Sequence, residues 1–441
     1  MSLVLRPYQA ELLDRVIAAL NAGTRTAVMQ LGTGGGKTAT ASALLARASS
    51  RGIASIFLAH LDSLISDTAA RLRADGIRCG FVQADRPTDP EALVQVASMA
   101  TLHVRGQRPP AGLIIVDECH RAMTESVRGI LDAYPEAWIL GLTATPQRAD
   151  GKALGNIFEA LFCGPSNRWL TEHGYLVPCD IVGPREFIER GRCEDPVDAY
   201  EREAPGTRAI VFESTVAEAE ALAARYTARG WPAGVIIGET PRAEREALVA
   251  AVWRGDIKVL VGVGVFIEGF DLPAIETVVL ARAFTVTGSF LQAIGRGLRP
   301  SPTTGKQRCL VLDLCGSTWL HGLPIEDRIW SIDGKAVRRA EATIPLRRCT
   351  KCLAIFKTAR KCPRCGAAGE AIERKKVPLN RAEKMEQLSA LPPEERDRRY
   401  LARLIRVATE RLRLDERRAS RWALQRFRKQ FGREPVEGAI T

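Results

Sequence analysis

The segment 31–38, LGTGGGKT, constrains the fold more than any other part of the chain. It follows a β-rich apolar run at 26–30 and precedes an Ala/Leu-rich stretch at 37–49, which predicts a strand, a tight loop and a helix. The glycines at 34–36 let backbone N–H groups close around phosphate oxygens, and the helix dipole favours an anion there. The segment therefore predicts a phosphate-binding loop, although Leu31 stands where the strict pattern has glycine.

A pair of carboxylates follows a second apolar run, 113–116, which ends in the sequence DECH. The run indicates a buried parallel strand that would deliver Asp117 to a metal ion and Glu118 to an attacking water. Lys37 can reach the β- and γ-phosphates, and the Thr38 hydroxyl can bind the metal. Together the two motifs predict a site that binds and hydrolyses a Mg²⁺-nucleoside triphosphate.

Strand-like and helix-like stretches alternate twice along the chain, which predicts two tandem α/β domains with parallel sheets. The strands expected in the first unit are 26–30, 54–59, 94–98, 113–116 and 138–142. Those expected in the second are 208–213, 234–237, 258–263, 277–280 and 307–313, with helices at 216–229 and 242–253. Only the first unit has a phosphate loop, so a ligand shared at the interface is expected. Residues 178–205 indicate an irregular connector.

The second unit contains the sequence SFLQAIGRGLRP at 289–300. On a helix, Gln292, Arg296 and Arg299 would share one face, because they lie at positions i, i+4 and i+7. Arginines that point in one direction bind phosphate or carboxylate, and an arginine brought to the γ-phosphate accelerates phosphoryl transfer. A surface helix paired with acidic residues would show the same pattern.

Six motifs in this order resemble a superfamily 2 helicase or translocase of the DEAD/DEAH-box type. They are RPYQ at 6–9, TGGGKT at 33–38, DECH at 117–120, GLTATP at 141–146, EGFD at 268–271 and QAIGRGLR at 292–299. The chain is most similar to the branch of type III restriction-enzyme helicase subunits (ResIII) and RadD-like DNA-repair ATPases. The resemblance covers roughly residues 3–320, and it implies two RecA-like P-loop NTPase domains.

The resemblance also implies roles for individual residues. The residues implied in ATP and Mg²⁺ binding are Arg6, Gln9, Thr33, Gly34, Gly35, Gly36, Lys37, Thr38, Asp117, Gly269 and Asp271. Catalysis would involve Lys37, Glu118, Arg296 and Arg299, and coupling of hydrolysis to lobe movement would involve His120, Thr143, Thr145 and Gln292. The nucleic acid backbone would contact segments at His60, Ser98–Thr101 (Ser98 and Thr101) and 214–215. Serine and threonine beside strand ends are also common helix caps, and the branch usually has a basic residue where Leu61 follows His60.

Two CxxC pairs follow the second unit: Cys349 with Cys352, and Cys362 with Cys365. The short intervening segment allows the four thiolates to surround one metal tetrahedrally, which predicts a structural zinc ribbon with no catalytic water. Redox pairs and thiols without a function are the alternative interpretations. Basic residues around the cysteines would suit phosphate contacts.

The C-terminal region is strongly basic. Residues 374–441 contain nineteen basic and ten acidic residues, so they carry nine of the twelve surplus positive charges of the chain. Trp422 and Phe427 lie among arginines there, a combination that can stack bases or anchor a small helical domain. No apolar run is long enough to cross a membrane, and an odd number of mostly scattered cysteines, eleven, favours a reducing compartment. We expect a cytoplasmic protein without a membrane partner.

The expected domains are two RecA-like domains at 1–165 and 206–325, a connector at 166–205, a zinc ribbon at 345–370 and a basic helical region at 376–441. The expected function is that of an ATP-dependent DNA helicase or translocase with ATP, Mg²⁺ and Zn²⁺ as cofactors. DNA is favoured by the resemblance alone, and RNA stays open. The alternatives are a remodelling ATPase or branch-recognition protein without processive unwinding, and the motor subunit of a restriction system. A protein partner from DNA repair, a phage or a restriction system is also expected.

Overall fold

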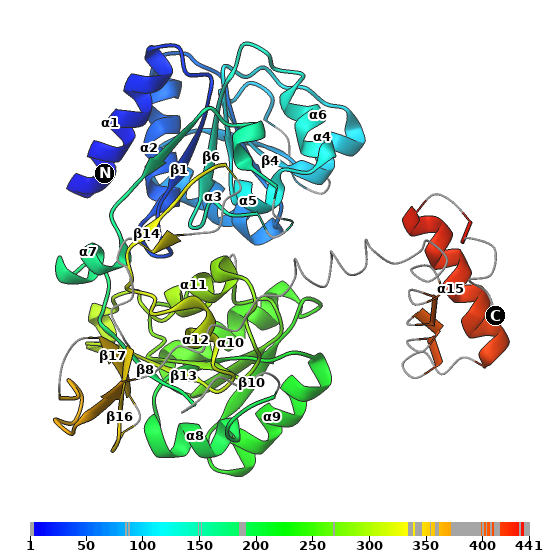
Figure 1. The fold of residues 1–441 in the computed structure, drawn as a ribbon. Helices are drawn as coiled ribbons and strands as arrows, with labels where there is room; N and C mark the ends of the chain where they lie inside the picture. Colours follow the sequence, from blue (N-terminus) through cyan, green and yellow to red (C-terminus); the bar gives the residue numbers. More distant parts are fainter. Residues whose placement is uncertain are drawn as a thin grey trace. The chain divides into compact units, whose positions relative to one another are not determined.

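The computed structural model describes most of the chain (Figure 1). The described residues are 4–371, apart from 84–85, 87–88, 149, 151, 185–190, 268–269, 334–337, 340–345, 353 and 358–360, and then 398, 401–402, 404–405, 408–409, 415–431 and 434–435. Residues 1–373 and 374–441 form two separate units. Within the described residues no helix has both the length and the apolar composition that a membrane span requires.

The first lobe is a parallel seven-stranded sheet with strand order β3-β4-β2-β5-β6-β1-β7. Its strands are β1 (Thr26–Gln30), β2 (Ser55–Ala59), β3 (Cys79–Val82), β4 (Val94–Ser98), β5 (Leu113–Val116), β6 (Trp138–Thr143) and β7 (Ala160–Cys163). Its helices are α1 (Pro7–Asn21), α2 (Lys37–Ser50), α3 (Asp62–Ala74), α4 (Met99–Arg105), α5 (Cys119–Ala122), α6 (Glu125–Leu131) and the 3-10 turn η1 (Leu154–Asn156).

Both faces of this sheet are buried, because successive side chains of each strand enter different cores. In β5, Leu113 and Ile115 pack in the core that also contains the apolar face of α1 and residues of α2 and α3. Ile114 and Val116 pack on the opposite face with residues of α4, α5 and α6. This alternation explains why the central strands are continuous apolar runs. Figure 1 shows α1 and α2 beside each other on one flank of the sheet.

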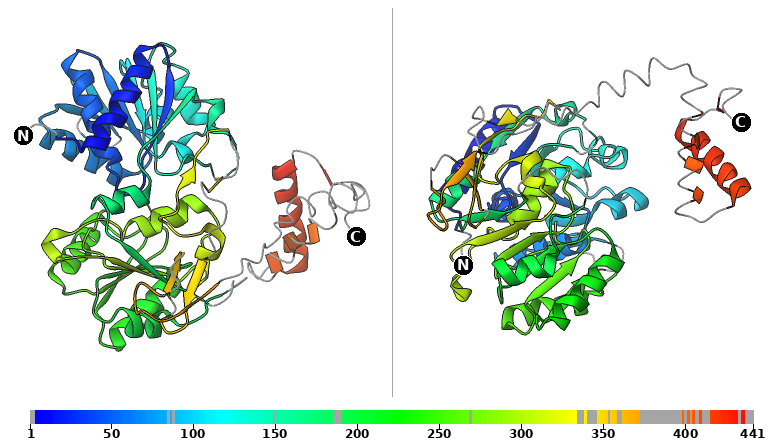
Figure 2. Two further views of the ribbon diagram at one scale, coloured as in Figure 1. Left: turned by 60° about the vertical axis from the view of Figure 1, so that its left-hand side comes forward. Right: turned by 60° about the horizontal axis from the view of Figure 1, so that its bottom comes forward.

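The second lobe has six parallel strands in the order β10-β11-β9-β12-β13-β8. They are β8 (Cys179–Val182), β9 (Ala209–Phe212), β10 (Ala233–Ile236), β11 (Val259–Gly262), β12 (Thr277–Leu280) and β13 (Cys309–Asp313). The helices are α8 (Pro196–Glu203), α9 (Val216–Ala228), α10 (Arg242–Arg254), α11 (Thr287–Gly295), α12 (Ser317–His321) and the 3-10 turn η2 (Pro302–Thr304). The views in Figure 2 show helices along both faces of the sheet.

Two segments connect the lobes. The first contains α7 (Asn167–Glu172), and its Leu170 and Leu176 belong to a core cluster that continues from one lobe into the other. The second is a return segment at 322–332, which leaves the second lobe and reaches the first, where the amide of Gly155 donates to the carbonyl of Ile332 at 2.7 Å. Within it, β14 (Arg328–Ile329) pairs antiparallel with β15 (Arg338–Arg339), which lies further along the chain.

The cysteine-rich segment extends the second sheet. Its strands are β16 (Leu346–Cys349), β17 (Ala354–Lys357) and β18 (Gly369–Ala371). β17 pairs antiparallel with β8, so Ala354 lies opposite Val182 and the sheet grows to nine strands. In the separate C-terminal unit the clearest element is α15 (Glu416–Phe431), where Phe427 and Ala423 pack against Leu401. Much of the expected basic region, including Arg403 and Arg411, lies outside the described residues.

The expected fold class is confirmed, and all ten expected strands are present. The elements that were not expected from the sequence include β3 and β7 in the first lobe, and β8 and α8 within the segment 178–205, which was expected to be irregular. β8 was missed because its sequence, CDIV, is short, contains an aspartate and lies among proline and charged residues.

The fold predicts that Gly297→Ala destabilises the second lobe. A Cβ atom at position 297 would lie 2.3 Å from the sulfur of Cys309 and 2.7 Å from a methyl group of Val278. Such overpacking costs about 1–3 kcal/mol, so the unfolding midpoint measured by circular dichroism should fall by several degrees. The control is Gly129→Ala in α6, where a Cβ meets no atom within 4 Å. This change should leave the midpoint unchanged or raise it, because alanine favours the helix. Equal midpoints for both variants would contradict the packing argument.

Candidate active site

The phosphate loop connects β1 to α2 and is shaped by two glycines with left-handed backbone. Gly34 has φ of 86° and Gly36 has φ of 88°, a conformation that L-residues rarely adopt. Gly36 is the residue before α2, so no side chain of its own covers the first amides of that helix. Lys37 and Thr38 are the first two residues of the helix. Free amides, positive helix dipole and lysine therefore meet at one place, which fits a bound triphosphate.

The N-terminal RPYQ motif is hydrogen-bonded to this loop. The hydroxyl of Tyr8 and the side-chain amide of Gln9 each donate to the carbonyl of Gly35 at 2.9 Å. The amide of Arg6 donates to Oε1 of Gln9 at 2.9 Å, which fixes the orientation of the glutamine. A Cβ atom at Gly36 would lie 2.1 Å from Nε2 of Gln9, so the close contact requires glycine. Gln9, which the family resemblance implies in ATP binding, thus lies directly against the phosphate loop.

The two carboxylates of the DECH motif lie at the carboxyl end of β5, and both are buried. Nζ of Lys37 is 2.7 Å from Oε1 of Glu118. Burial raises the pKa of Asp117, and the charge of Glu118 raises it further, to about 6. One lysine therefore does not fully offset two adjacent buried carboxylates, and this imbalance fits a divalent cation held by Asp117 and Thr38.

Glu118 has a strained backbone, with φ of 44°. Among the described residues it alone combines a positive φ with a side chain. Its conformation turns the carboxylate toward Lys37 and allows α5 to begin at the next residue. Backbone strain of this kind typically occurs at functional sites.

A chain of polar contacts continues from Glu118 through the first lobe. Nδ1 of His120 lies 3.4 Å from Oε2 of Glu118 and 2.9 Å from Oγ1 of Thr143. The hydroxyl of Thr143 accepts from the amide of Thr145 at 3.0 Å. Histidine, carboxylate and both threonines therefore form one connected network, as a coupling role would require.

The second lobe reaches this network with one face of α11. Gly288, Gln292 and Gly295 lie on that face at positions i, i+4 and i+7. Nε2 of Gln292 is 3.5 Å from Oε2 of Glu118, at the outer limit of a hydrogen bond. A Cβ at Gly295 would lie 2.4 Å from Cβ of Thr33, and one at Gly288 would lie 2.7 Å from Oγ1 of Thr145. The two glycines therefore let α11 touch the phosphate loop and the threonine motif.

Arg296 and Arg299, which follow Gln292 in the sequence QAIGRGLR, do not lie where the sequence predicted. α11 ends at Gly295, so Arg296 and Arg299 lie beyond the helix and do not continue the face of Gln292. Arg296 is buried and donates to the carbonyls of Phe270, at 2.6 Å, and of Ile267. Arg299 forms an ion pair with Asp271 and lies near the phosphate loop, since its Cγ is 3.5 Å from the Cβ position of Gly34. Glu268 and Gly269 lie outside the described residues.

The segments expected to contact nucleic acid include two helix caps. Oγ of Ser98 accepts from the amide of Thr101 at 3.4 Å, and Oγ1 of Thr215 accepts from the amide of Glu218 at 3.2 Å. His60 is exposed at the end of β2, and its charge lowers the pKa of Asp117, though less than burial raises it.

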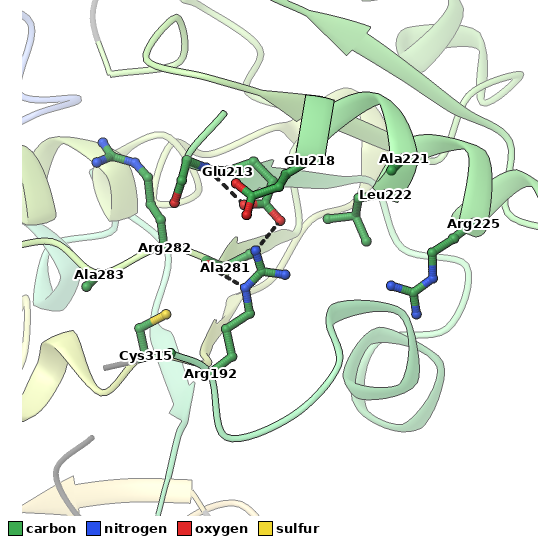
Figure 3. A pocket seen from close by; sticks show the side chains of 12 residues that line it. Arg192, Glu213, Glu218, Ala221, Leu222, Arg225, Ala281, Arg282, Ala283 and Cys315 are labelled. Carbon is green, nitrogen blue, oxygen red and sulfur yellow. Dashed lines mark hydrogen bonds and ion pairs between the residues drawn. The ribbon is translucent and has the colours of Figure 1, made fainter. Parts of the chain in front are cut away.

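A cavity of about 610 Å³ opens in the second lobe beside Ser214 (Figure 3). The arginine side chains that line it are Arg192, Arg225 and Arg282. Arg192 pairs at 2.5 Å with Glu213, which is buried at the end of β9.

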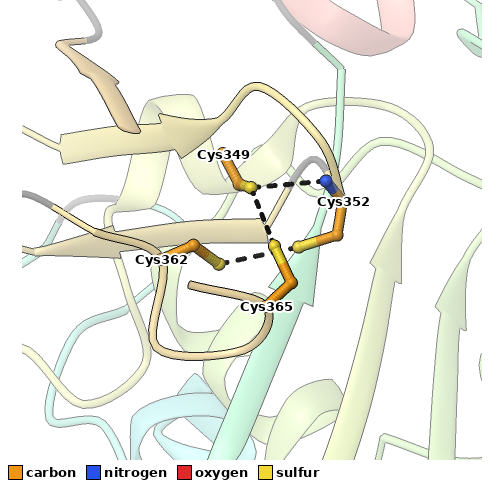
Figure 4. Close-up of side chains that lie close together, drawn as sticks. All are labelled: Cys349, Cys352, Cys362 and Cys365. Atoms are coloured by element: carbon orange, nitrogen blue, oxygen red, sulfur yellow. Dashed lines mark hydrogen bonds between the residues drawn. The ribbon is translucent and has the colours of Figure 1, made fainter. Parts of the chain in front are cut away.

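The four cysteines of the ribbon converge at one point (Figure 4). Their sulfur atoms all lie within 4.8 Å of one another, with 3.3 Å between Cys349 and Cys365 and 3.6 Å between Cys352 and Cys362. Four thiolates around Zn²⁺ are about 3.8 Å apart, so the arrangement is compatible with zinc. Burial raises the pKa of the Cys349 thiol, but hydrogen bonds from the amides of Cys352 and Lys351 outweigh it and lower that pKa to about 6.

Some residues of the site carried no recognisable motif. Oδ1 of Asn167 is 2.5 Å from the Cβ position of Gly32, and its Nδ2 donates to the carbonyl of Pro324 in the return segment at 3.3 Å. Tyr175 and Trp169 lie beside Tyr8. The concentration of aromatic residues at 169–175 was the only sequence signal available.

Comparison with known proteins identifies both lobes. Residues 2–148 match the family described as type III restriction enzyme, res subunit, and residues 193–301 match the helicase conserved C-terminal domain. The chain is 25% identical over 363 residues to a 51.5 kDa protein of a Lactococcus phage, with 77% of each chain covered. It is 24% identical to the putative ATP-dependent helicase IRC3 of Saccharomyces cerevisiae, covering 71% of this chain and 52% of that protein. For the putative mitochondrial ATP-dependent helicase irc3 of Schizosaccharomyces pombe, identity is 27%, with 72% and 58% covered. The match thus spans little more than half of the yeast proteins.

Solved structures support the fold. A fragment of a putative HsdR subunit of a type I restriction enzyme from Vibrio vulnificus superposes with a TM-score of 0.59 at 20% identity, covering 75% of this chain and 67% of that one. The type ISP restriction-modification enzyme LlaBIII gives a TM-score of 0.53 at 14% identity, covering 71% and 28%. The matched domains imply a nucleotide-hydrolysing enzyme that uses ATP and Mg²⁺. The family resemblance inferred from the six motifs is thus confirmed, and the chain belongs to helicase superfamily 2, with a first lobe of the ResIII type and a second lobe of the helicase C-terminal type.

Proposed function

We propose that the protein is an ATP-dependent DNA helicase or translocase that hydrolyses ATP between its two RecA-like lobes. The observation that carries the proposal is the convergence of three side chains at one point. Lys37 of the phosphate loop and Gln292 of the second lobe lie at the two carboxylate oxygens of Glu118, at 2.7 and 3.5 Å. Binding or release of the phosphates would therefore change contacts made by both lobes.

In the proposed reaction, Glu118 accepts a proton from the attacking water. Lys37 would exchange its contact with Glu118 for phosphate oxygens, which frees the carboxylate to act as a base. Thr38 and Asp117 would hold Mg²⁺, whose charge stabilises the transferred phosphoryl group. Gln292 would orient the water, or its contact with Glu118 would change once the water has reacted.

Arg299 would stabilise the phosphates after leaving Asp271, because its stem already lies beside Gly34. Arg296 would support it by holding the backbone carbonyls of Ile267 and Phe270. Movement of the lobes would then follow from making and breaking the contacts of α11 with Thr33 and Thr145. The return segment at 322–332 would limit that movement to a hinge rotation.

DNA is the proposed substrate because the structures with a similar fold include a restriction-modification enzyme described as bound to DNA. A structure of Dbp5 of S. cerevisiae, described as bound to RNA, has a similar fold, so RNA is the competing substrate. The basic C-terminal residues would add electrostatic affinity for either polymer. All eleven cysteines are free, which favours a reducing compartment such as the cytoplasm.

A second candidate is the motor subunit of a restriction system. It is favoured by the match of the first lobe to the type III restriction family. A motor subunit of this kind would act together with a nuclease that cleaves the DNA. Co-purification with a nuclease, together with ATP-dependent cleavage by the complex, would support this role.

Glu118→Gln should retain ATP binding and lose hydrolysis. Glutamine preserves the shape and the contact with Lys37 but cannot take a proton, so we expect turnover to fall by about 10²- to 10⁴-fold. Phosphate release and binding of a fluorescent ATP analogue would measure the two effects separately. The matched control is Glu125→Gln, an exposed residue in the first turn of α6, which should not change turnover. Wild-type turnover in Glu118→Gln would show that the assigned role is wrong.

ATP hydrolysis should increase when nucleic acid is added. We would compare single-stranded DNA, duplex DNA, forked DNA and RNA at one fixed salt concentration, because phosphate contacts make binding depend on salt. A helicase should also displace a labelled strand. Stimulation by DNA without displacement would instead support the remodelling alternative, and stimulation by RNA alone would overturn the choice of DNA.

The ribbon should contain one zinc ion per chain. Atomic spectroscopy should find about one equivalent in the wild-type protein and much less in Cys362→Ser, because a structural site needs all four thiolates. The control is Cys193→Ser, which removes an exposed cysteine outside the ribbon. A chelator should lower the unfolding midpoint of the wild type and of this control. Full zinc content in Cys362→Ser would contradict the proposed ligand set.

A further inference from the structure

A buried lysine joins the two backbone segments that carry the ion pair of Arg299 and Asp271. Lys306 lies three residues before β13 and is only 7% exposed. Its ammonium donates to the carbonyl of Arg299 at 2.9 Å and to the carbonyl of Pro273 at 3.1 Å. Lys306 therefore connects the backbone of the arginine motif to the backbone of the segment that follows Asp271.

The charge of this lysine is stabilised without a carboxylate partner. Among the residues that the structure describes, Lys306 forms no ion pair, and carbonyl oxygens accept from its ammonium instead. Burial is the main cause that lowers the pKa of Lys306 to about 8; Arg299 also lowers it, whereas Cys309 and Glu276 raise it. Lysine is rarely buried without a paired charge, and residues that break such rules typically serve a function. The lysine thus indicates a role beyond filling the core.

The arginine motif and the segment around Asp271 are therefore connected in two ways. The first connection is the ion pair itself, in which the side chain of Asp271 is 70% exposed. The second is the buried ammonium of Lys306 with its two carbonyl partners. An ion pair open to solvent contributes little and can exchange, whereas buried hydrogen bonds to a charged group are costly to break. Arg299 can therefore release Asp271 while its own backbone stays in place.

Arg296 makes the same kind of contact with an earlier part of this segment. Its guanidinium donates to the carbonyls of Phe270 and Ile267. Arg296 and Lys306 thus both hold backbone carbonyls, whereas Arg299 pairs with an exposed side chain. This difference fits a side chain that can move on a backbone that is fixed on both sides.

We propose that Lys306 is a positioning residue for Arg299: it fixes the backbone from which the guanidinium leaves Asp271 and reaches the phosphates. The assignment rests on the proposed ATPase and adds the residue that determines where its arginine can reach. The stem of Arg299 already lies beside Gly34, so a small displacement of its backbone would move the guanidinium away from the phosphates. A misplacement of about 1 Å can lower the rate of a reaction by about 100-fold.

A purely structural role for Lys306 makes a different prediction. If the lysine only stabilised the second lobe, its loss would lower turnover whether or not Arg299 is present. If it acts through Arg299, its loss would have no further effect once that arginine has been removed. A double-mutant cycle with Arg299→Ala separates the two roles, because the effects of residues that act as a unit do not multiply.

The test measures phosphate release at saturating Mg²⁺-ATP and binding of Mg²⁺-ADP, both with the full chain. Lys306→Met keeps the length of the side chain and loses its charge, so kcat should fall by about 10- to 100-fold while ADP affinity changes by less than about 2-fold. In the Arg299→Ala background, the same change should lower kcat by less than about 2-fold. The matched control is Lys258→Met, which replaces a lysine just before β11 in the same lobe and should keep the wild-type kcat.

Circular dichroism would show whether Lys306→Met folds. If it does not, Lys306→Arg provides the same cycle with a smaller expected loss of kcat. Arginine keeps a cation at this position but places its donors differently, so the backbone of Arg299 would shift rather than lose its partner.

Each outcome decides one question. A wild-type protein that neither binds ADP nor hydrolyses ATP would overturn the proposed ATPase itself. A wild-type kcat in the Lys306 variant, an equal loss of kcat in both backgrounds, or a loss of ADP affinity would overturn only the positioning role. A wild-type kcat in Arg299→Ala would overturn it as well, because turnover would then not depend on this arginine. A loss of kcat that is confined to the background containing Arg299, with ADP affinity retained, would establish it.

Discussion

The contact between the lobes depends on two glycines of α11, which have no side chains to hold the lobes apart. Gly288 and Gly295 lie two helical turns apart on α11, and between them Gln292 points from the same face toward Glu118. A methyl group at either glycine would collide with Thr145 or Thr33. The backbone of the second lobe can therefore approach the phosphate loop closely enough for one glutamine to reach the carboxylate. The contact of Gln292 with Glu118 requires this approach.

The charge arrangement at the site is unbalanced in a way that favours its ligand. Asp117 and Glu118 are adjacent and buried, Lys37 is bound to only one of them, and the pKa of Asp117 is raised accordingly. A divalent cation would relieve the repulsion between the carboxylates, and phosphate oxygens would take over the lysine. Binding thus replaces one set of contacts by another at the same place, which is the property that a switch requires.

Much of the fold could be predicted from sequence, because buried parallel strands are apolar runs and the phosphate loop has a fixed pattern. The two motifs of the first lobe also predicted that Lys37 and Glu118 share one site, whereas the contact of Gln292 with Glu118 was not predicted. The failures have physical causes. The face of α11 was assigned to Arg296 and Arg299, although the helix ends at Gly295, and the end of a short helix is weakly specified by local sequence. β8 was missed because tertiary pairing, with β13 and β17, stabilises a strand of low intrinsic propensity. The contacts of Trp169 and Tyr175 with Tyr8 were not predicted, because packing between segments far apart in sequence leaves no periodic signal.

The pairing of β17 with β8 gives the cysteine ribbon a second consequence. β8 would be the outermost strand of the six parallel strands of the second lobe, and β17 occupies the hydrogen-bonding groups on its outer side. Uncovered strand edges recruit strands from other molecules. The ion pair between Arg364 of the ribbon and Glu203 of α8, at 2.9 Å, adds a second attachment. Loss of the ribbon's structure would thus expose the unpaired edge of β8. The four cysteines therefore also protect the protein against aggregation through this strand.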